Sequence, residues 1–301
     1  MFEDIKGHET WQRIKKIERG WSRDTKYYIE TINGEKLLLR TSAKEAFDKK
    51  KKEFEMIAKF SKLDIHMSKA LDFGWFNNHQ EVYMLLTWVE GQDLDDVLPK
   101  LDISKQYALG RQAGAILKAI HSIPLPDDEI PQTTKIPKKK KQIELYETSQ
   151  LRIDGDEIAL KFLKDHIDQI WTKPPVYLHG DFHPGNLILT PDQNIGVIDF
   201  NRWEIGDPYE EFYKLESFGT KVSIPFCIGQ IEAYFNDHIP NDFWEIFVIY
   251  CAHSALYSIK WAEPFGIDEV HVMMDICRKT MIHFDNFRQS IPSWYQQSSF
   301  K

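Results

Sequence analysis

Short apolar runs alternate with polar turns over the first third of the chain, and this pattern predicts strands. The runs cover residues 14–18, 26–32, 36–40, 70–76 and 81–88. Asn33-Gly34 separates the second run from the third, and this dipeptide between apolar runs is a strong hairpin signal. We therefore expect an antiparallel meander of the first three runs, with 70–76 and 81–88 as two further strands.

One helix is expected within the strand-rich third, over residues 43–63. Its apolar positions, which fall on one helical face, are Phe47, Phe54, Ile57, Ala58 and Phe60. The lysine run 49–52 lies in the same segment, and we interpret it as a solvated face.

The remaining two thirds have mostly helical periodicity. Helices are expected at residues 104–123, 157–171, 242–260 and 270–287. Two short apolar runs, 176–179 and 195–200, are interpreted as buried strands within this helical part. Residues 124–141 combine prolines, an acidic triplet and a lysine run, and they are expected to form an exposed loop. The order favours an α+β protein, with a small strand-rich lobe followed by a larger helical lobe.

Composition narrows the class of protein. The 301 residues are 42% hydrophobic and 28% charged, which is typical of a globular chain that buries a large core. The net charge of −8 argues against a nucleic-acid binder, since such proteins are usually basic. The chain begins without an apolar signal segment, and charged residues interrupt its most apolar stretch, so neither secretion nor a membrane span is expected. Three widely spaced cysteines, expected as core residues, fit a reducing cytoplasm.

The segment YLHGDFHPGN, residues 177–186, carries the clearest chemical signal. A predicted strand leads to Asp181, Asn186 follows five residues later, and a second predicted strand leads to Asp199. Two carboxylates and an amide suit Mg²⁺, which proteins hold through one or two carboxylates together with substrate phosphates. The Asp-x-x-x-x-Asn spacing matches the catalytic loop of kinases. The pattern favours metal-assisted phosphoryl transfer, and a structural turn between core strands is the alternative.

HGDFHPGN, followed by IDF at residues 198–200, resembles the aminoglycoside phosphotransferase-like kinases, which are small-molecule relatives of the protein kinases and include choline and homoserine kinase types. The resemblance extends over nearly the whole chain. It implies a bilobal, protein-kinase-like α+β fold, with a nucleotide-binding lobe over residues 1–88 and a catalytic, acceptor-binding lobe over residues 89–301. The small lobe would hold an antiparallel sheet and one helix, and the hinge would lie at about residues 87–91.

The same resemblance implies roles for the residues of the signal segment. Asp181 would orient the acceptor hydroxyl and take its proton. Asn186 and Asp199 would coordinate Mg²⁺ that bridges the phosphates of ATP or GTP.

Two side chains of the first lobe are expected to serve the nucleotide. Arg40 stands where kinases place a phosphate-binding lysine, and Glu53 is its expected ion-pair partner. Arginine binds phosphate in a bidentate manner, so the chemistry survives the change of residue. Lys36, on the same strand face as Arg40, and Glu55 remain alternatives for these two roles.

Backbone groups are expected to make further nucleotide contacts. A Gly-x-Gly-x-x-Gly loop is absent from the sequence, and only Gly20 and Ser22 suit a close approach of the backbone to phosphates. A hairpin turn without a ligand is the alternative. At the hinge, backbone groups around Thr87 and Val89 are expected to meet the adenine or guanine edge.

Candidate acceptor contacts follow from the positions of polar residues around the two strands and near a late helix end. They are His183, Arg202, Glu204 and Glu263. The absence of a functional role is the alternative for His183, and His179 is expected to brace the loop. Asp207, which precedes a proline, is expected to cap a helix.

The predicted function is nucleotide-dependent transfer of the γ-phosphate to a hydroxyl of a small molecule. An aminoglycoside is the leading acceptor, and choline, homoserine, a macrolide or another metabolite is the alternative. A nucleotide-binding pseudokinase would be favoured by loss of Asp181 or Asp199, and both residues are present. The chain is expected to act as a monomer or weak homodimer.

Charge is distributed unevenly along the chain. Residues 1–90 carry 17 basic and 15 acidic side chains, whereas residues 91–301 carry 21 and 31. An acidic acceptor lobe would attract a cationic acceptor and raise its encounter rate. A solvated acidic surface that aids solubility is the alternative.

Overall fold

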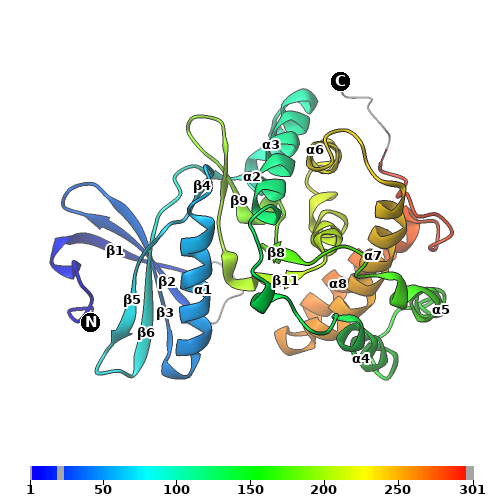
Figure 1. Cartoon of the computed structure of the whole chain (residues 1–301), viewed down its shortest axis with the longest axis horizontal. Coiled ribbons are helices and arrows are strands. Elements are labelled where there is room, and N and C mark those ends of the chain that lie inside the picture. Colours follow the sequence, from blue (N-terminus) through cyan, green and yellow to red (C-terminus); the bar gives the residue numbers. More distant parts are fainter. Residues whose placement is uncertain (1, 19–23, 296–301) are drawn as a thin grey trace. The chain divides into compact units, whose positions relative to one another are not determined.

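The chain forms two compact units whose boundaries do not follow a single cut in the sequence. The computed structural model describes residues 2–18 and 24–295 (Figure 1). The first unit contains the residues up to Gln92 together with Ile188–Trp203, and the second contains Asp93–Leu187 and the residues from Glu204 onward. The boundary between two functional lobes that we expect near residue 88 stays a prediction. The sequence analysis did not predict that residues 188–203 belong to the first unit.

A five-stranded antiparallel sheet forms the first unit. Its strands are β1 (Trp11–Ile17), β2 (Thr25–Thr31), β3 (Lys36–Ala43), β6 (Glu81–Thr87) and β5 (Ala70–Phe76), in that spatial order. Strands β1, β2 and β3 are neighbours in chain order, so the predicted meander of the first three strands is confirmed. The two further predicted strands extend the same sheet, with β6 between β3 and β5. Apolar side chains of one sheet face, including Ile29 and Leu39, pack with Phe2 and Ile5 from the start of the chain.

A single helix, α1 (Phe47–Phe60), contacts β5 and β6 (Figure 1). It buries Met56, Ile57 and Phe60, as the helical periodicity of this segment predicts. Glu53 and Lys50 are also buried. The prediction of a solvated face over the lysine run was therefore wrong for Lys50. Its ammonium pairs with carboxylates, and the hydrophobic pattern does not reveal such pairing.

Further short strands lie in the first unit and at the points in the sequence where one unit ends and the other begins. Within the first unit, β10 (Ile195–Val197) pairs in parallel with β4 (His66–Met67). Two further strands, β7 (Gln92–Asp93) and β9 (Leu187–Leu189), each run across a border between the units. The buried strand expected at residues 195–200 is thus confirmed in its first half.

Helices form most of the second unit. They are α2 (Leu94–Val97), α3 (Ile103–His121), α4 (Ile136–Glu147), α5 (Glu157–His166), α6 (Ile224–Tyr234), α7 (Asn241–Ala262) and α8 (Ile267–His283). A two-stranded ribbon pairs β8 (Val176–Leu178) with β11 (Glu204–Gly206) in antiparallel fashion. This distribution confirms the α+β class and the helical character of the second part.

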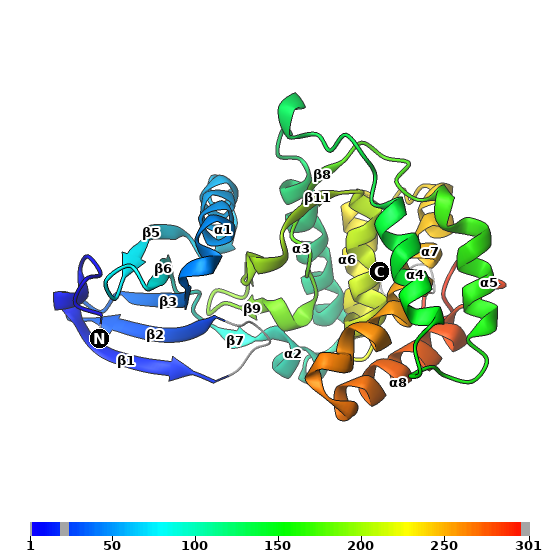
Figure 2. The ribbon, with the colours of Figure 1, turned by 90° about the horizontal axis from the view of Figure 1, so that it is seen from below.

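Helices α3 and α6 lie side by side (Figures 1 and 2). A glycine permits their close approach, because a Cβ atom on Gly110 would lie 2.1 Å from the carbonyl oxygen of Phe226. Long α7 packs on α8 and buries most of its side chains. Over residues 2–18 and 24–295, the structure contains no helix with the length and apolarity that crossing a membrane requires.

Short 3₁₀ and π turns complete the chain. The 3₁₀ turns are η1 (His8–Thr10), η2 (Lys44–Ala46), η3 (Leu98–Lys100), η4 (Asp127–Glu129), η5 (Ile167–Gln169), η6 (Pro184–Asn186), η7 (Phe200–Arg202), η8 (Pro208–Phe212) and η10 (Glu263–Phe265). A π-helical turn, η9, covers Leu215–Gly219.

The prediction of an exposed loop over residues 124–141 was wrong for the C-terminal end of this segment. Helix α4 begins at Ile136, with Pro137 in its first turn, where proline is compatible with a helix. Lys139 is buried because its ammonium lies 2.7 Å from Glu210, and Ile143 and Tyr146 pack inward. The three cysteines are buried and unpaired with one another, as expected of core residues.

Candidate active site

The loop that carries Asp181 is fixed through its backbone. Strand β8 ends at Leu178, and Gly180 then adopts a φ of +81°, a conformation that side chains with a Cβ rarely take. The carboxylate of Glu211 accepts hydrogen bonds from the N–H groups of Gly180 (3.1 Å) and Phe182 (3.3 Å). Nδ1 of buried His179 accepts from the Asp181 N–H at 3.2 Å. These contacts hold the chain on both sides of Asp181.

Glu211 stays ionised in this buried position. Burial by itself would raise the pKa of its carboxyl group, but the nearby rings of His121, at 3.7 Å, and His179 and the Gly180 N–H together lower that pKa. A carboxylate that accepts several N–H bonds is a stable anchor for a loop. Glu211 therefore anchors the loop that carries Asp181.

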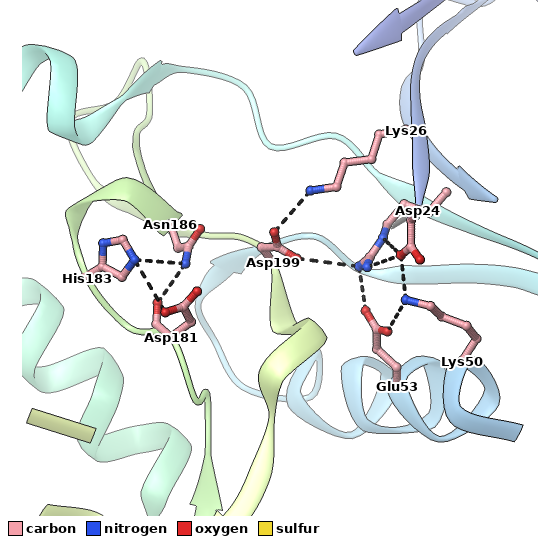
Figure 3. A network of polar contacts seen from close by, with 9 residues as sticks. Asp24, Lys26, Lys50, Glu53, Asp181, His183, Asn186 and Asp199 are labelled. Atoms are coloured by element: carbon pink, nitrogen blue, oxygen red, sulfur yellow. Dashed lines mark hydrogen bonds and ion pairs between the residues drawn. The ribbon is translucent and has the colours of Figure 1, made fainter. Parts of the chain in front are cut away.

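Asp181, His183 and Asn186 lie close together in the loop (Figure 3). The Nδ2 of Asn186 donates to the backbone oxygen of Asp181 at 2.9 Å. The Nε2 of His183 is 3.6 Å from Oδ1 of Asp181, and its Nδ1 accepts from the Gly185 N–H. Burial lowers the pKa of His183 to about 4, so its ring is neutral at pH 7. The predicted Asp-x-x-x-x-Asn segment is therefore one hydrogen-bonded turn.

Asp199 follows β10 in the first unit and has an unusual backbone conformation. Its φ and ψ are both 63°, in the left-handed region that residues other than glycine seldom adopt. Lys26 lies 3.2 Å from Oδ2, and Arg40 lies 3.8 Å from Oδ1 (Figure 3). Oδ1 is buried and accepts no hydrogen bond within the described residues. A buried carboxylate oxygen of this kind fits a hard cation such as Mg²⁺.

Arg40 and Glu53 form the ion pair that the sequence predicts, with 2.6 Å between Nη1 and Oε1. Lys50 lies 2.9 Å from the other oxygen of Glu53 and 2.6 Å from Asp24, which also accepts from Nε of Arg40 at 3.0 Å. Figure 3 shows the side chains of Asp24, Lys50 and Glu53 pointing toward one another. The alternatives lie elsewhere, because Lys36 pairs with Glu90 and Glu55 is exposed.

The charges of this cluster stabilise one another. Burial would raise the pKa of Asp24, but Arg40 and Lys50 lower it to about 2. Burial would lower the pKa of Arg40, and Glu53, Asp24 and Asp199 together raise it. Sequence reasoning did not identify Asp24, Lys26 or Lys50. One signal was present, since Lys50 precedes Glu53 by three residues and such a spacing brings side chains together on a helix.

The sequence can now be assigned to a protein family. The profile of the phosphotransferase enzyme family matches residues 13–243. The chain belongs to this family. No curated protein matches the sequence significantly.

The fold of this phosphotransferase is similar to the folds of several solved structures. The GDP complex of wild-type aminoglycoside 2′-phosphotransferase-IIIa superposes with a TM-score of 0.73 at 15% identity, over 93% of this chain and 96% of the other. A thermostable mutant of aminoglycoside phosphotransferase APH(4)-Ia, in complex with AMP-PNP and hygromycin B, gives 0.71 at 16% identity over 92% and 96%. Amicoumacin kinase hAmiN, in complex with AMP-PNP, Ca²⁺ and Ami, gives a TM-score of 0.66 at 11% identity over 93% and 90%. The expected protein-kinase-like fold is confirmed.

The remaining nucleotide candidates of this phosphotransferase stay predictions. Gly20 and Ser22 lie outside the described residues. Thr87 ends β6, where its N–H donates to the carbonyl of Lys69 and its hydroxyl accepts from the Lys69 N–H. Val89 follows in the expected hinge.

Two of the acidic acceptor candidates are paired within the protein. Glu204 lies 2.7 Å from Lys135, and Glu263 accepts from Ser149 and pairs with Lys260. Arg202 is exposed in η7. Roles of these residues and of His183 in acceptor binding stay predictions.

The capping role of Asp207 is confirmed. Its Oδ1 accepts from the Tyr209 N–H at 3.0 Å, at the start of η8. Its Oδ2 accepts from the Tyr250 hydroxyl and the Trp171 N–H, both at 2.9 Å. Burial raises the pKa of this carboxyl in spite of these hydrogen bonds. Asp207 therefore anchors the segment that leads to Glu211.

Proposed function

We propose that this member of the phosphotransferase family transfers the γ-phosphoryl group of ATP or GTP to a hydroxyl of a small molecule. The observation that carries the proposal is the loop around Asp181. Glu211 and His179 hold its backbone, and Asn186 closes it from within. Such a loop presents one carboxylate in a fixed position, and positioning supplies most of the catalysis in phosphoryl transfer.

Asp181 is the proposed catalytic base. Its carboxylate takes the proton of the acceptor hydroxyl as the acceptor oxygen bonds to the γ-phosphorus. The bond from that phosphorus to the bridging oxygen breaks, and its electron pair leaves with the nucleoside diphosphate. Asn186 uses its Nδ2 to close the loop. Its carbonyl oxygen is the atom we assign to the metal.

The first unit supplies the proposed nucleotide-binding side chains. Asp199 and Asn186 would hold Mg²⁺, which when bound neutralises charge on the phosphates. Lys26 and Arg40 bring further positive charge to the neighbourhood of Asp199. Glu53 fixes the guanidinium of Arg40. Gly20, Ser22, Thr87 and Val89 remain the proposed backbone contacts to the nucleotide.

The acceptor we propose to test first is an aminoglycoside. The acidic balance of residues 91–301 supports a cationic acceptor, and two of the similar structures named above are aminoglycoside phosphotransferases. Internal pairing of Glu204 and Glu263 reduces the acidic charge left for a ligand. Choline, homoserine and macrolides therefore remain acceptors to be tested. Amicoumacin is added to them, because one of the similar structures is an amicoumacin kinase.

The deciding experiment measures release of ADP or GDP with each nucleotide and Mg²⁺ against a panel of these acceptors. A phosphotransferase releases diphosphate in proportion to one acceptor and yields a phosphorylated product of matching mass. A thermal shift with MgATP or MgGTP, but background hydrolysis across the panel, would favour the pseudokinase alternative. Absence of both responses would contradict nucleotide-dependent transfer altogether.

A further inference from the structure

A lysine that the sequence analysis did not single out contacts the proposed base. Nζ of Lys214 lies 2.6 Å from Oδ1 of Asp181, and both residues belong to the second unit. The lysine side chain is 5% exposed. A buried ammonium is costly unless a carboxylate compensates it, so this pair is unlike a surface salt bridge.

The local fold presents Lys214 to the loop. Lys214 immediately precedes the π-helical turn η9, and π turns recur at functional sites because they redirect side chains. Its ammonium lies 5.0 Å from the ring centre of Tyr213 and 5.3 Å from that of Phe218. The Phe218 ring also contacts the ring of His183, with 5.0 Å between their centres. The turn thus supplies a cation and an aromatic wall to the same carboxylate and its neighbour.

We propose that Lys214 is a positioning residue for phosphoryl transfer, which holds the Asp181 carboxylate in the orientation that takes the acceptor proton. The inference rests on the proposed function. Once Asp181 is protonated, the buried ammonium no longer faces a carboxylate, and an oxygen of the transferred phosphoryl group is the natural anion to replace it.

Other polar groups lie near Asp181. His183 and His179 belong to its own loop, and Tyr213, whose ring contacts the Lys214 ammonium, precedes η9. Nε2 of His183 is 3.6 Å from Oδ1 of Asp181, whereas Nζ of Lys214 is at 2.6 Å. Lys214 is therefore the closest cation to this oxygen among the contacts described above.

The test compares Lys214→Met, Lys214→Arg and the control Lys221→Met. Lys221 is exposed and also lies near the Phe218 ring, at 5.6 Å, so the control removes a matched charge away from the base. Steady-state ADP release is measured over a range of MgATP concentrations, with the acceptor found in the panel and with water as acceptor. Circular dichroism and MgATP affinity check the folding of each variant.

We expect Lys214→Met to lower kcat by 10-fold or more, with little change in MgATP affinity, on the order expected for loss of a positioned general base. The loss should appear in kcat and not in the KM for MgATP, because a displaced base slows the chemical step and leaves nucleotide binding intact. Lys214→Arg should restore most of the rate. Lys221→Met should behave like the unmodified protein.

A folded Lys214→Met variant that keeps the unmodified kcat, or that loses kcat and MgATP affinity together, would overturn the proposal. If that variant does not fold, Lys214→Gln is measured against the same criteria. Should neither variant fold, Lys214→Arg decides, since a folded arginine variant that does not retain most of the rate would overturn the proposal. Failure of the proposed function is distinguishable, because the unmodified protein would then release no ADP with any acceptor.

Discussion

The guanidinium of Arg40 and the carboxylate of Glu53 are within 2.6 Å of each other, and each side chain is at most 3% exposed. Lys50 binds the second oxygen of the same carboxylate. Two cations therefore depend on Glu53 for compensation of their charge. Removing one partner of such a buried group leaves uncompensated charge, which costs more than the pair itself contributes.

We expect Glu53→Gln to lower the free energy of unfolding by about 3 kcal/mol for this reason. Chemical denaturation measures the change. Glu55→Gln is the matched control, because Glu55 is exposed two residues further along α1. Its expected effect is within about 0.5 kcal/mol. Equal losses in the two variants would show that the Glu53 contacts add nothing to stability.

Asp181→Ala is expected to lower kcat by about 10²–10⁴-fold while leaving MgATP affinity nearly unchanged, since the loop backbone is held by Glu211 and His179 rather than by the Asp181 carboxylate. Steady-state diphosphate release and equilibrium nucleotide binding give the two quantities. Asp192→Ala, at the turn after β9, removes an exposed carboxylate as a control. Turnover at the unmodified rate in Asp181→Ala would rule out its role as base.

Asp199→Ala is expected to abolish the effect of Mg²⁺ on nucleotide binding. The variant loses the buried Oδ1 that lacks a hydrogen-bond donor in the described part of the chain. Thermal shifts with ATP, with and without Mg²⁺, measure the difference directly. An undiminished gain in melting temperature on adding Mg²⁺ to the variant would show that the metal binds elsewhere.

Acid stability should depend on Asp24. Its pKa falls from the ordinary value of 3.8 to about 2 in the folded protein. A depressed carboxyl pKa contributes stability that is complete above the unfolded value and is lost as the pH falls through the folded value. The shift corresponds to about 2 kcal/mol.

The comparison of unmodified protein with Asp24→Asn isolates this contribution. We expect their difference in unfolding free energy to be constant above about pH 5 and to shrink between about pH 4 and pH 2, because only the unmodified chain titrates at this position. Denaturant titrations at several pH values measure it. A difference that is independent of pH over that interval would contradict the ionised, paired state of Asp24.

Apolar periodicity predicted the elements that bury apolar faces. The strand expected at residues 70–76 is β5, the one at 81–88 is β6, and the long amphipathic helix after residue 103 is α3. The same criterion fails where charged side chains are buried in pairs. Lys50 and Lys139 count as exposed in a hydrophobicity pattern, and their carboxylate partners are distant in the sequence or ambiguous within it.

The same distinction applies to the candidate site. Some of its residues can be proposed from local sequence, and others only from the fold. Asp181, Asn186 and Asp199 could be found because their spacing is a local property of the chain. Lys214 could not, since it follows Asp181 by 33 positions and the fold alone brings its ammonium to the carboxylate. Acceptor contacts are the hardest to predict, because a glutamate in sequence does not reveal whether an internal lysine already neutralises it.

The return of Ile188–Trp203 to the first unit has a consequence for how the protein is made. Strand β10 pairs with β4, so the first unit lacks one of its strands until about residue 203 has been synthesised. By then the ribosome has also delivered α3, α4 and α5 of the second unit. Neither unit can finish folding as an N-terminal domain ahead of the rest, and the usual domain-by-domain order of synthesis does not apply. Truncation at Gln92 should therefore keep the five strands of the main sheet but leave β4 without its partner β10.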